Sequence, residues 1–217
     1  MKLKNMIKVL SLISLLIMGG CQMSNDQVTD PEEVAAEDLP DVPAFKDEFT
    51  RGFLTSIQET KDGFYPFLSG TGNYEMSLPE DGIVSERSYS IKGDYIETAY
   101  VEVEKDEVMI RIRFEYYGSE AYPDLDTSKL ALEGSVGEKL DFQKESKENH
   151  TVFLSKYREG DSNKKGFAVI AKRENTESLW IRYKIELTEE NTPEKEQIFN
   201  QESNYFHKWL ETVKFTD

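Results

Sequence analysis

The chain has 217 residues and is strongly acidic, with 26 lysines and arginines against 42 aspartates and glutamates and a formal net charge of −16 at pH 7. Nucleic acid phosphates and anionic lipid headgroups repel a surface of this charge, which excludes a nucleic-acid-binding protein. The single cysteine excludes an internal disulfide, so the fold must rely on a hydrophobic core, for which the length is sufficient.

The chain begins with a short basic and apolar segment. Lys2, Lys4 and Lys8 precede a ten-residue apolar run over residues 9–18, which two serines interrupt. A membrane-spanning helix needs about 20 apolar residues, whereas a run of this length is typical of the hydrophobic region of a signal peptide. We therefore expect residues 1–20 to be a signal peptide, with a short signal anchor as the alternative.

The apolar run ends in Met18-Gly19-Gly20-Cys21, which contains the only cysteine of the chain. This motif resembles the lipobox of bacterial lipoproteins, Leu-(Ala/Ser/Thr)-(Gly/Ala)-Cys, with methionine at the leucine position and glycine at the second. The resemblance implies a diacylglyceryl thioether on Cys21 and cleavage after Gly20. Two acyl chains give lasting attachment, whereas one gives only marginal binding. We expect a domain anchored to the extracytoplasmic face of the cell membrane through the lipid on Cys21.

Residues 21–43 follow the cleavage site and are expected to form a disordered acidic tether. Residues 22–43 contain seven acidic residues and three prolines, but no basic or aromatic residue. A segment with so few apolar groups does not repay the entropy of ordering, and its own charge extends it. The alternative is an acidic docking peptide for a basic partner.

A single globular α+β domain is expected over residues 44–217, and it begins with a helix. Apolar side chains recur at helical spacing over residues 44–61, namely Phe45, Phe49, Phe53, Leu54 and Ile57. Pro43 suits the first turn of this helix, and Gly63 marks its end.

Alternating apolar residues predict strands after this helix. Strands are expected over 64–68 and 74–79, joined by a turn at 69–72, and a hairpin is expected from Tyr95 to Tyr117. In the hairpin, Val103 is expected opposite Val108 and Ala99 opposite Ile112, which places the apolar residues of both strands on one face.

A further strand is expected over 152–157, followed by a second hairpin over 166–173 and 178–187. In this hairpin Ile170 is expected opposite Ile181, and Ala168 opposite Tyr183. Large apolar residues occur on both of its faces, which predicts cover on both sides of the sheet.

Residues 118–137 are expected to be irregular and include Asp124 and Asp126, whose alternation is typical of calcium loops. An EF-hand loop starting at Asp124 requires glycine sixth and glutamate twelfth, but Lys129 and Ser135 occupy those positions. Weak binding of a divalent cation therefore stays only an alternative.

The last segment predicts a long helix. Asn191 and Thr192 are capping residues before Pro193. The residues of one broad apolar face follow: Ile198, Phe199, Tyr205, Phe206, Trp209, Leu210 and Val213. We expect this face to pack on the sheet.

Residues suited to catalysis do not form a recognisable set. His150 and His207 are the only histidines, and nothing in the sequence pairs them as metal ligands. Glu75, Glu97 and Glu115 lie on predicted strands and could belong to a glycosidase-like carboxylate pair, although solvated strand glutamates are more usual. We therefore assign no catalytic, cofactor-binding or metal-ligating residue and do not expect an enzyme.

The predicted order of elements, together with Tyr-Glu-Met-Ser-Leu-Pro-Glu-Asp-Gly at residues 74–82, resembles the PsbP type of domain over about residues 64–215. Gly82 and Ile83 replace the tryptophan that usually follows the proline turn. The resemblance implies an α/β/α sandwich used for binding or assembly. We expect an antiparallel sheet of about six strands, flanked by an N-terminal and a long C-terminal helix.

The sequence thus predicts a lipid-anchored lipoprotein of the bacterial cell envelope that acts as a binding or interaction module with an envelope protein partner and without a cofactor. The alternatives are an envelope hydrolase with paired carboxylates and a weak divalent-cation-binding protein.

Overall fold

The computed structural model describes residues 29–105, 107–160, 164–173, 176–188 and 194–216, so Cys21 and the lipobox lie outside the described residues. Its helices are η1 (Pro31–Glu33), η2 (Ala36–Asp38), α2 (Pro43–Lys46), α3 (Glu48–Arg51), η3 (Glu86–Ser88), α4 (Leu125–Val136) and α5 (Lys195–Leu210). Its strands are β1 (Phe64–Leu68), β2 (Tyr74–Pro79), β3 (Gly82–Val84), β4 (Ser90–Lys92), β5 (Ile96–Lys105), β6 (Val108–Tyr117), β7 (Gln143–Ser146), β8 (Thr151–Arg158), β9 (Lys164–Arg173), β10 (Glu177–Leu187) and β11 (Lys214–Phe215).

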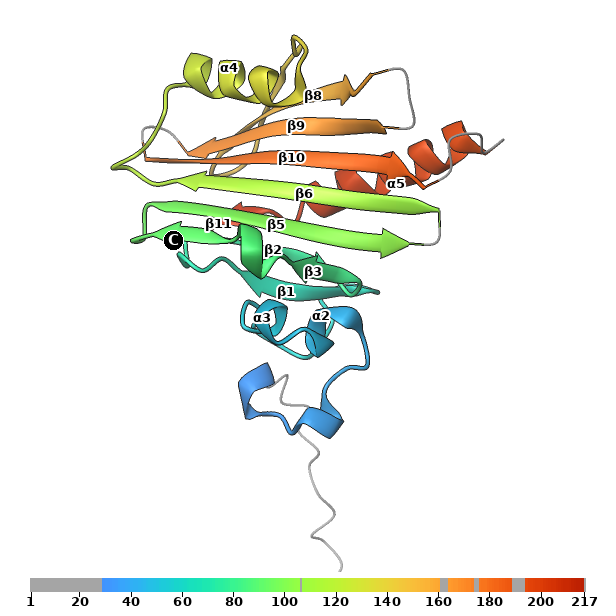
Figure 1. Cartoon of the computed structure of the whole chain (residues 1–217). Helices are drawn as coiled ribbons and strands as arrows, with labels where there is room; N and C mark the ends of the chain where they lie inside the picture. Colours follow the sequence, from blue (N-terminus) through green and yellow to red (C-terminus); the bar gives the residue numbers. More distant parts are fainter. Residues whose placement is uncertain (1–28, 106, 161–163, 174–175, 189–193, 217) are drawn as a thin grey trace, which may run out of the picture.

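The strands form one large and one small antiparallel sheet (Figure 1). The large sheet has eight strands in the order β3-β5-β6-β10-β9-β8-β7, with β4 also paired to β5, and the small sheet has the order β1-β2-β11. The large sheet has more strands than predicted. The prediction missed β3, β4 and β7, which are only three or four residues long. Strands this short carry too little alternation to be recognised.

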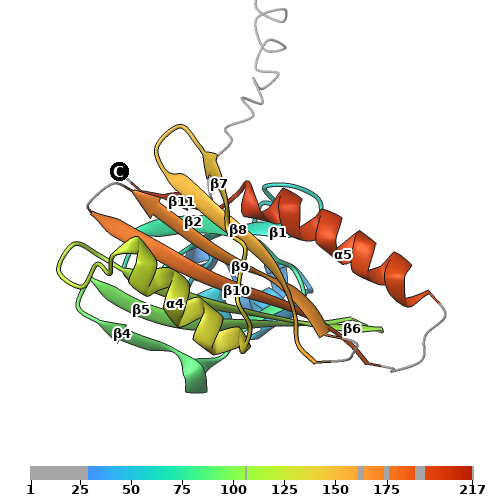
Figure 2. The same ribbon diagram turned by 90° about the horizontal axis from the view of Figure 1, so that it is seen from above.

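Helices cover the two faces of the large sheet, as Figure 2 shows with α4 and α5 on opposite sides. The small sheet and α5 enclose the main hydrophobic core, which includes Phe114, Tyr183, Phe206 and Trp209. A second, smaller cluster lies under α4 and includes Leu132, Ile170 and Trp180. The predicted α+β sandwich with a C-terminal helix is confirmed. No helix among the described residues is both long and apolar enough to cross a membrane.

The second helical layer comes from a segment that was expected to be irregular. Asp124 accepts a hydrogen bond from the backbone N–H of Thr127 at 2.8 Å and so caps the start of α4. The helix escaped prediction because its apolar pattern is weak: Leu132 is buried, but Leu130 is 70% exposed.

The predicted helix over residues 44–61 is wrong, because the chain forms two four-residue helices there. Asp47 has extended backbone angles between them, and its carboxylate accepts a hydrogen bond from the backbone N–H of Thr50 at 2.7 Å. This cap starts α3 as a separate helix, so α2 and α3 do not form one continuous helix. Phe45, Phe53 and Leu54 still reach the core.

The predicted disordered tether differs from the structure over residues 29–43, which fold against the domain. The carbonyl of Thr29 accepts a hydrogen bond from the backbone N–H of Ile57 at 3.1 Å. Pro31 is buried, and Leu39 and Val42 pack on the main core. The prediction from composition was wrong here because a few apolar side chains are enough to order a segment when they pack on a folded domain. Residues 21–28 of the expected tether lie outside the described residues.

The two hairpins form with different registers from those predicted. In β5 and β6, Val103 lies opposite Ile110 instead of Val108, a shift of two residues that keeps the predicted face. In β9 and β10, Ile170 lies opposite Trp180 instead of Ile181. This shift of one residue exchanges faces, so Ile181 and Tyr183 belong to the main core. The expectation of apolar residues on both faces is nevertheless confirmed.

The C-terminal helix is confirmed, with Ile198, Phe199, Phe206, Trp209 and Leu210 buried. Its predicted capping residues, 191–193, lie outside the described residues.

Candidate functional site: an open sheet face

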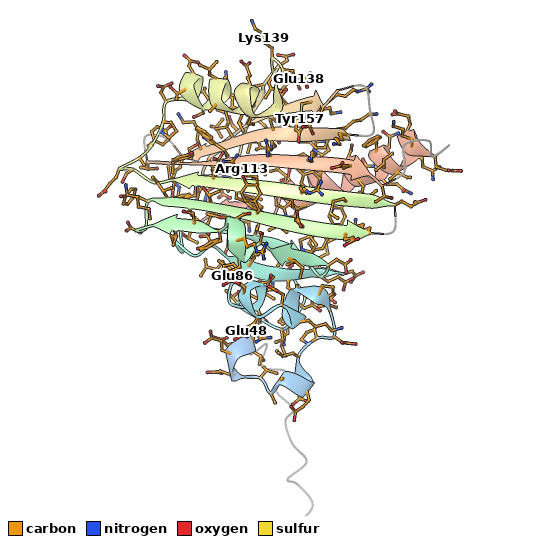
Figure 3. All side chains as sticks on the ribbon, in the orientation of Figure 1. Glu48, Glu86, Arg113, Glu138, Lys139 and Tyr157 are labelled. Atoms are coloured by element: carbon orange, nitrogen blue, oxygen red, sulfur yellow. The ribbon has the colours of Figure 1, made fainter. Side chains whose placement is uncertain are left out.

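One half of the large sheet lacks a helical cover within the described residues. The open face, as we name it, consists of outward side chains of β5, β6 and β10: Tyr100, Glu102, Arg111, Arg113, Glu115, Arg182 and Lys184. The helix α4 contacts β9 and β10 beside it, whereas β5 and β6 run uncovered across the front of the molecule (Figure 1). Figure 3 shows Arg113 near the middle of this face. Strand alternation produces the face, since every second residue of β5 and β6 points into the core.

Strand pairing brings four cations together on the open face. Arg113 lies directly opposite Arg182, and Arg111 directly opposite Lys184. Like charges in directly opposed positions destabilise a sheet. Such a block is unexpected in a chain with 42 acidic residues against 26 basic ones. We call these four residues the cation block.

Glutamates neutralise part of this block. Arg111 donates to Glu186 at 2.6 Å and to Glu102 at 3.3 Å. Arg113 pairs with Glu115. Lys184 lies 3.7 Å from Glu159. The side chains of Arg111, Arg113 and Lys184 remain 40%, 30% and 22% exposed, so a partner can still reach them.

The two opposed arginines retain unused donors. The Nε of Arg113 is buried and has no hydrogen-bond partner among the described residues. Arg182 donates from Nη1 to the carbonyl of Ser135 in α4 at 2.9 Å and makes no ion pair within the described part of the chain. A guanidinium has five N–H donors in a planar fork that matches a carboxylate or a phosphate. The partly exposed Arg182 can therefore bind an anionic group from outside the protein, whereas the buried Nε of Arg113 is out of reach of such a group.

Aromatic side chains border the cation block. The guanidinium of Arg113 lies over the ring of Tyr100, 5.3 Å from its centroid. The rings of Tyr117 and Trp180 are in contact, with centroids 4.7 Å apart. Burial and the nearby carboxylate of Glu115 raise the pKa of Tyr117. Arginine and tyrosine are among the residues enriched at the centres of protein interfaces, whereas Trp180 is itself buried in the cluster under α4.

The structure does not bring together the three strand glutamates considered as a catalytic pair. Glu115 lies on the open face, and Glu75 is exposed on β2 of the small sheet. Glu97 is fully buried on the opposite face of β5, so the expectation of a solvated glutamate is wrong for it. Glu75 lines a hollow of about 460 Å³ that also contains Glu211.

Glu97 holds a turn rather than a substrate. Its two carboxylate oxygens accept hydrogen bonds from the backbone N–H groups of Gly70 at 3.0 Å and Thr71 at 3.1 Å, and from the hydroxyl of Thr71 at 3.0 Å. Burial and the charge of Glu97 raise the pKa of Tyr74 well above its usual value. This carboxylate fixes the connection between β1 and β2 to strand β5 of the large sheet.

The remaining candidates have structural surroundings. His150 lies beside Asn149 and the ring of Phe215, and burial lowers its pKa. His207 contacts Phe167 and Phe206. The cap that Asp124 forms with Thr127 lowers the pKa of its carboxyl. Among the described residues, no group of three or more histidines, cysteines, aspartates or glutamates is arranged to hold a metal ion.

A family model and one relative both match most of the length of this chain. Residues 40–214 match the family described as "Putative lipoprotein YvcA". The lipoprotein of that name from Bacillus subtilis (strain 168) is 30% identical over 167 residues, which cover 71% of this chain and 69% of the relative. The family match therefore includes residues 40–43 of the segment that folds against the domain, both sheets and α5.

Proposed function

The chain belongs to the YvcA family of lipoproteins, and from this premise we propose that it is a lipid-anchored binding module of the cell envelope. A diacylglyceryl group on Cys21 holds it at the extracytoplasmic face of the cell membrane. The sequence Met18-Gly19-Gly20-Cys21 supports this attachment through its resemblance to the lipobox. The sandwich with its C-terminal helix agrees with the arrangement that the PsbP resemblance implies.

The cation block is the observation that carries the binding role. It places two incompletely paired guanidinium groups beside the half-buried ring of Tyr100, on a face that α4 reaches only at Arg182. A carboxylate on a protein segment complements Arg182, the member of the cation block without an ion pair in the described residues. The proposed partner is therefore an envelope protein with an acidic surface segment.

The anchor is tested by mass spectrometry of the protein extracted from membranes. We expect an N-terminal Cys21 with a diacylglyceryl adduct and loss of residues 1–20. A Cys21→Ala variant should lose the adduct and leave the membrane fraction. Recovery of the unmodified wild-type chain with Gly20 and Cys21 still joined overturns the proposed anchor.

The binding role is tested with a photo-crosslinking amino acid placed at Tyr100 on the open face, and at Leu130 as an exposed control on α4. We expect a discrete cross-linked product from position 100, weakened by salt and absent from position 130. Arg182→Glu should abolish it while preserving the fold, because a glutamate opposite Arg113 forms a favourable pair. Equal cross-linking from both positions, or a product indifferent to Arg182→Glu, contradicts the proposal.

The hydrolase alternative rests on the hollow that Glu75 and Glu211 share. Glu211 is already paired with Lys147 at 2.9 Å, which leaves one uncommitted carboxylate. Incubation of the wild type with cell-wall glycans decides this alternative: release of soluble sugar that Glu75→Gln abolishes supports it, and no release excludes it for these substrates.

A further inference from the structure

The docked segment, residues 29–43, determines at which end the chain leaves the domain. It lies beyond α2 and α3, at the end of the molecule opposite α4 (Figure 1). Lys139, next to α4, and Glu48, on α3, mark these two ends in Figure 3. The N-terminal segment therefore leaves the domain at one end, and α4 lies at the opposite end.

Several contacts hold the docked segment in place. The hydrogen bond from Ile57 to the carbonyl of Thr29 fixes its first described residue. Leu39 and Val42 pack on the main core further along. The backbone N–H of Ala44 then donates to the carbonyl of Glu80 at 2.9 Å, where the segment joins α2.

Docking shortens the distance between the anchor residue and the domain. From Cys21 to Pro43 a fully extended chain reaches about 75 Å, at about 3.4 Å per residue. From Cys21 to Thr29 the eight intervening steps reach about 27 Å at most. Since the domain itself begins at Thr29, the second distance limits how far this end moves from an anchor on Cys21.

Charge acts on the separation between this end and the bilayer. The docked segment carries six acidic residues and no basic one: Asp30, Glu32, Glu33, Glu37, Asp38 and Asp41. Anionic headgroups repel the docked segment, so this end of the domain does not bind directly to the lipid surface. The short connection limits the separation that this repulsion can produce.

We infer that the protein is oriented on the membrane, with the α2 and α3 end facing the lipid surface and α4 pointing away from it. This inference rests on the proposed lipid anchor. In this orientation the long strands run along the membrane plane, and the open face points sideways (Figure 1). The partner of the cation block is then a protein that stands beside this one on the same membrane.

Energy transfer from two positions on the domain tests the orientation. The lipidated protein is inserted into vesicles of phosphatidylcholine and phosphatidylglycerol that carry an acceptor dye on their headgroups. A donor dye is attached to Glu48→Cys or to Lys139→Cys, both exposed positions, while the thioether occupies the thiol of Cys21. We expect transfer from position 48 to exceed that from position 139 several-fold. Equal transfer, or stronger transfer from position 139, overturns the inference.

Release of the docked segment provides the decisive variant. Leu39→Asp combined with Val42→Asp should detach the segment, lengthen the connection and bring the ratio of the two transfers toward one. Glu33→Gln, at an exposed position of the same segment, should leave the ratio unchanged. If the ratio survives detachment, the docked segment does not orient the protein.

Flotation of the same vesicles separates the two proposals. A wild-type protein that does not float with the vesicles contradicts the lipid anchor. A protein that floats but transfers equally from both positions contradicts the orientation alone.

Discussion

The two faces of the large sheet are built from the same strands but have different surroundings. One face is closed by α5 and the small sheet over a core rich in aromatic rings, including Phe114, Tyr183 and Trp209. The other is closed by α4 only at one side and presents the cation block elsewhere. The comparison indicates that burial on one face supplies most of the stability, which leaves the second face able to carry opposed arginines.

The largest expected effect on stability is at Trp209, on the closed face. Its ring is buried against Phe114 and Tyr183, and its Nε1 donates to the carbonyl of Ser77 in β2 at 3.0 Å. Trp209→Ala should lower the free energy of unfolding by about 3–5 kcal/mol, since it removes a large core side chain. Urea denaturation measures the loss, and a loss below about 1 kcal/mol contradicts the closed face as the main source of stability.

A smaller loss is expected at Leu132, which is buried under α4 among Ile170 and Trp180. Leu132→Ala should cost about 2–3 kcal/mol, at the low end of the usual range because the small cluster can collapse around the gap. The control is Leu130→Ala, at a 70% exposed position of the same helix, which should have little effect. A loss equal to that of Trp209→Ala would make the two faces energetically equivalent.

Glu97 tests a polar contact on the closed face. Glu97→Gln removes the charge that accepts hydrogen bonds from Gly70 and Thr71 and turns one acceptor into a donor. We expect a loss of about 1–3 kcal/mol, because backbone donors are left without a partner. Hydrogen exchange should quicken at the amides of Gly70 and Thr71 and remain slow in the middle of β9. Unchanged exchange at both amides shows that the carboxylate does not hold this turn.

Alkaline pH tests the buried tyrosines of the closed face. Burial raises the pKa of Tyr183 well above 10 and that of Tyr89 to about 12. Since the folded-state pKa exceeds that of the unfolded chain, stability is complete below pH 10 and declines as the pH rises above it. Tyr183→Phe should change stability by less than about 1 kcal/mol at pH 7, because the hydroxyl has no partner among the described residues. The variant should lose less stability than the wild type between pH 10 and 12, and an equal loss refutes this role of Tyr183.

The smallest effect is expected on the open face. Arg113→Met removes an ion pair with Glu115 but also relieves the opposition of Arg113 to Arg182. The two changes should nearly cancel, with a shift within about 0.5 kcal/mol in urea denaturation. The same variant should lose the cross-link from position 100. A large loss of stability would indicate that the cation block is part of the structural framework.

Prediction from the sequence succeeded where alternation alone decides the outcome. Alternation in residues 99–114 placed Ala99, Val101 and Ile110 on the core face despite a register wrong by two, since such a shift preserves the face. It failed for Ile181 and Tyr183, where the error was a single residue.

The candidate site depends on contacts between distant parts of the chain. Arg113 and Arg182 meet only because β6 pairs with β10, a pairing that no local pattern specifies. Glu97 is buried because the turn before β2 reaches over it, and its position on a strand does not reveal this. The signal in the sequence is the alternation of cations along two predicted strands of an acidic chain, Arg111 and Arg113 on one and Arg182 and Lys184 on the other.

The small sheet also has a consequence for the timing of folding. Its middle strand, β2, pairs with β11, and the indole of Trp209 donates to Ser77, across a separation of 132 residues. Contacts between residues so far apart in the sequence form late, because a long loop must close before they contribute. The main core therefore cannot be completed before residues 209–215 are in place. The strand that closes the small sheet thus takes part in one of the last steps of folding.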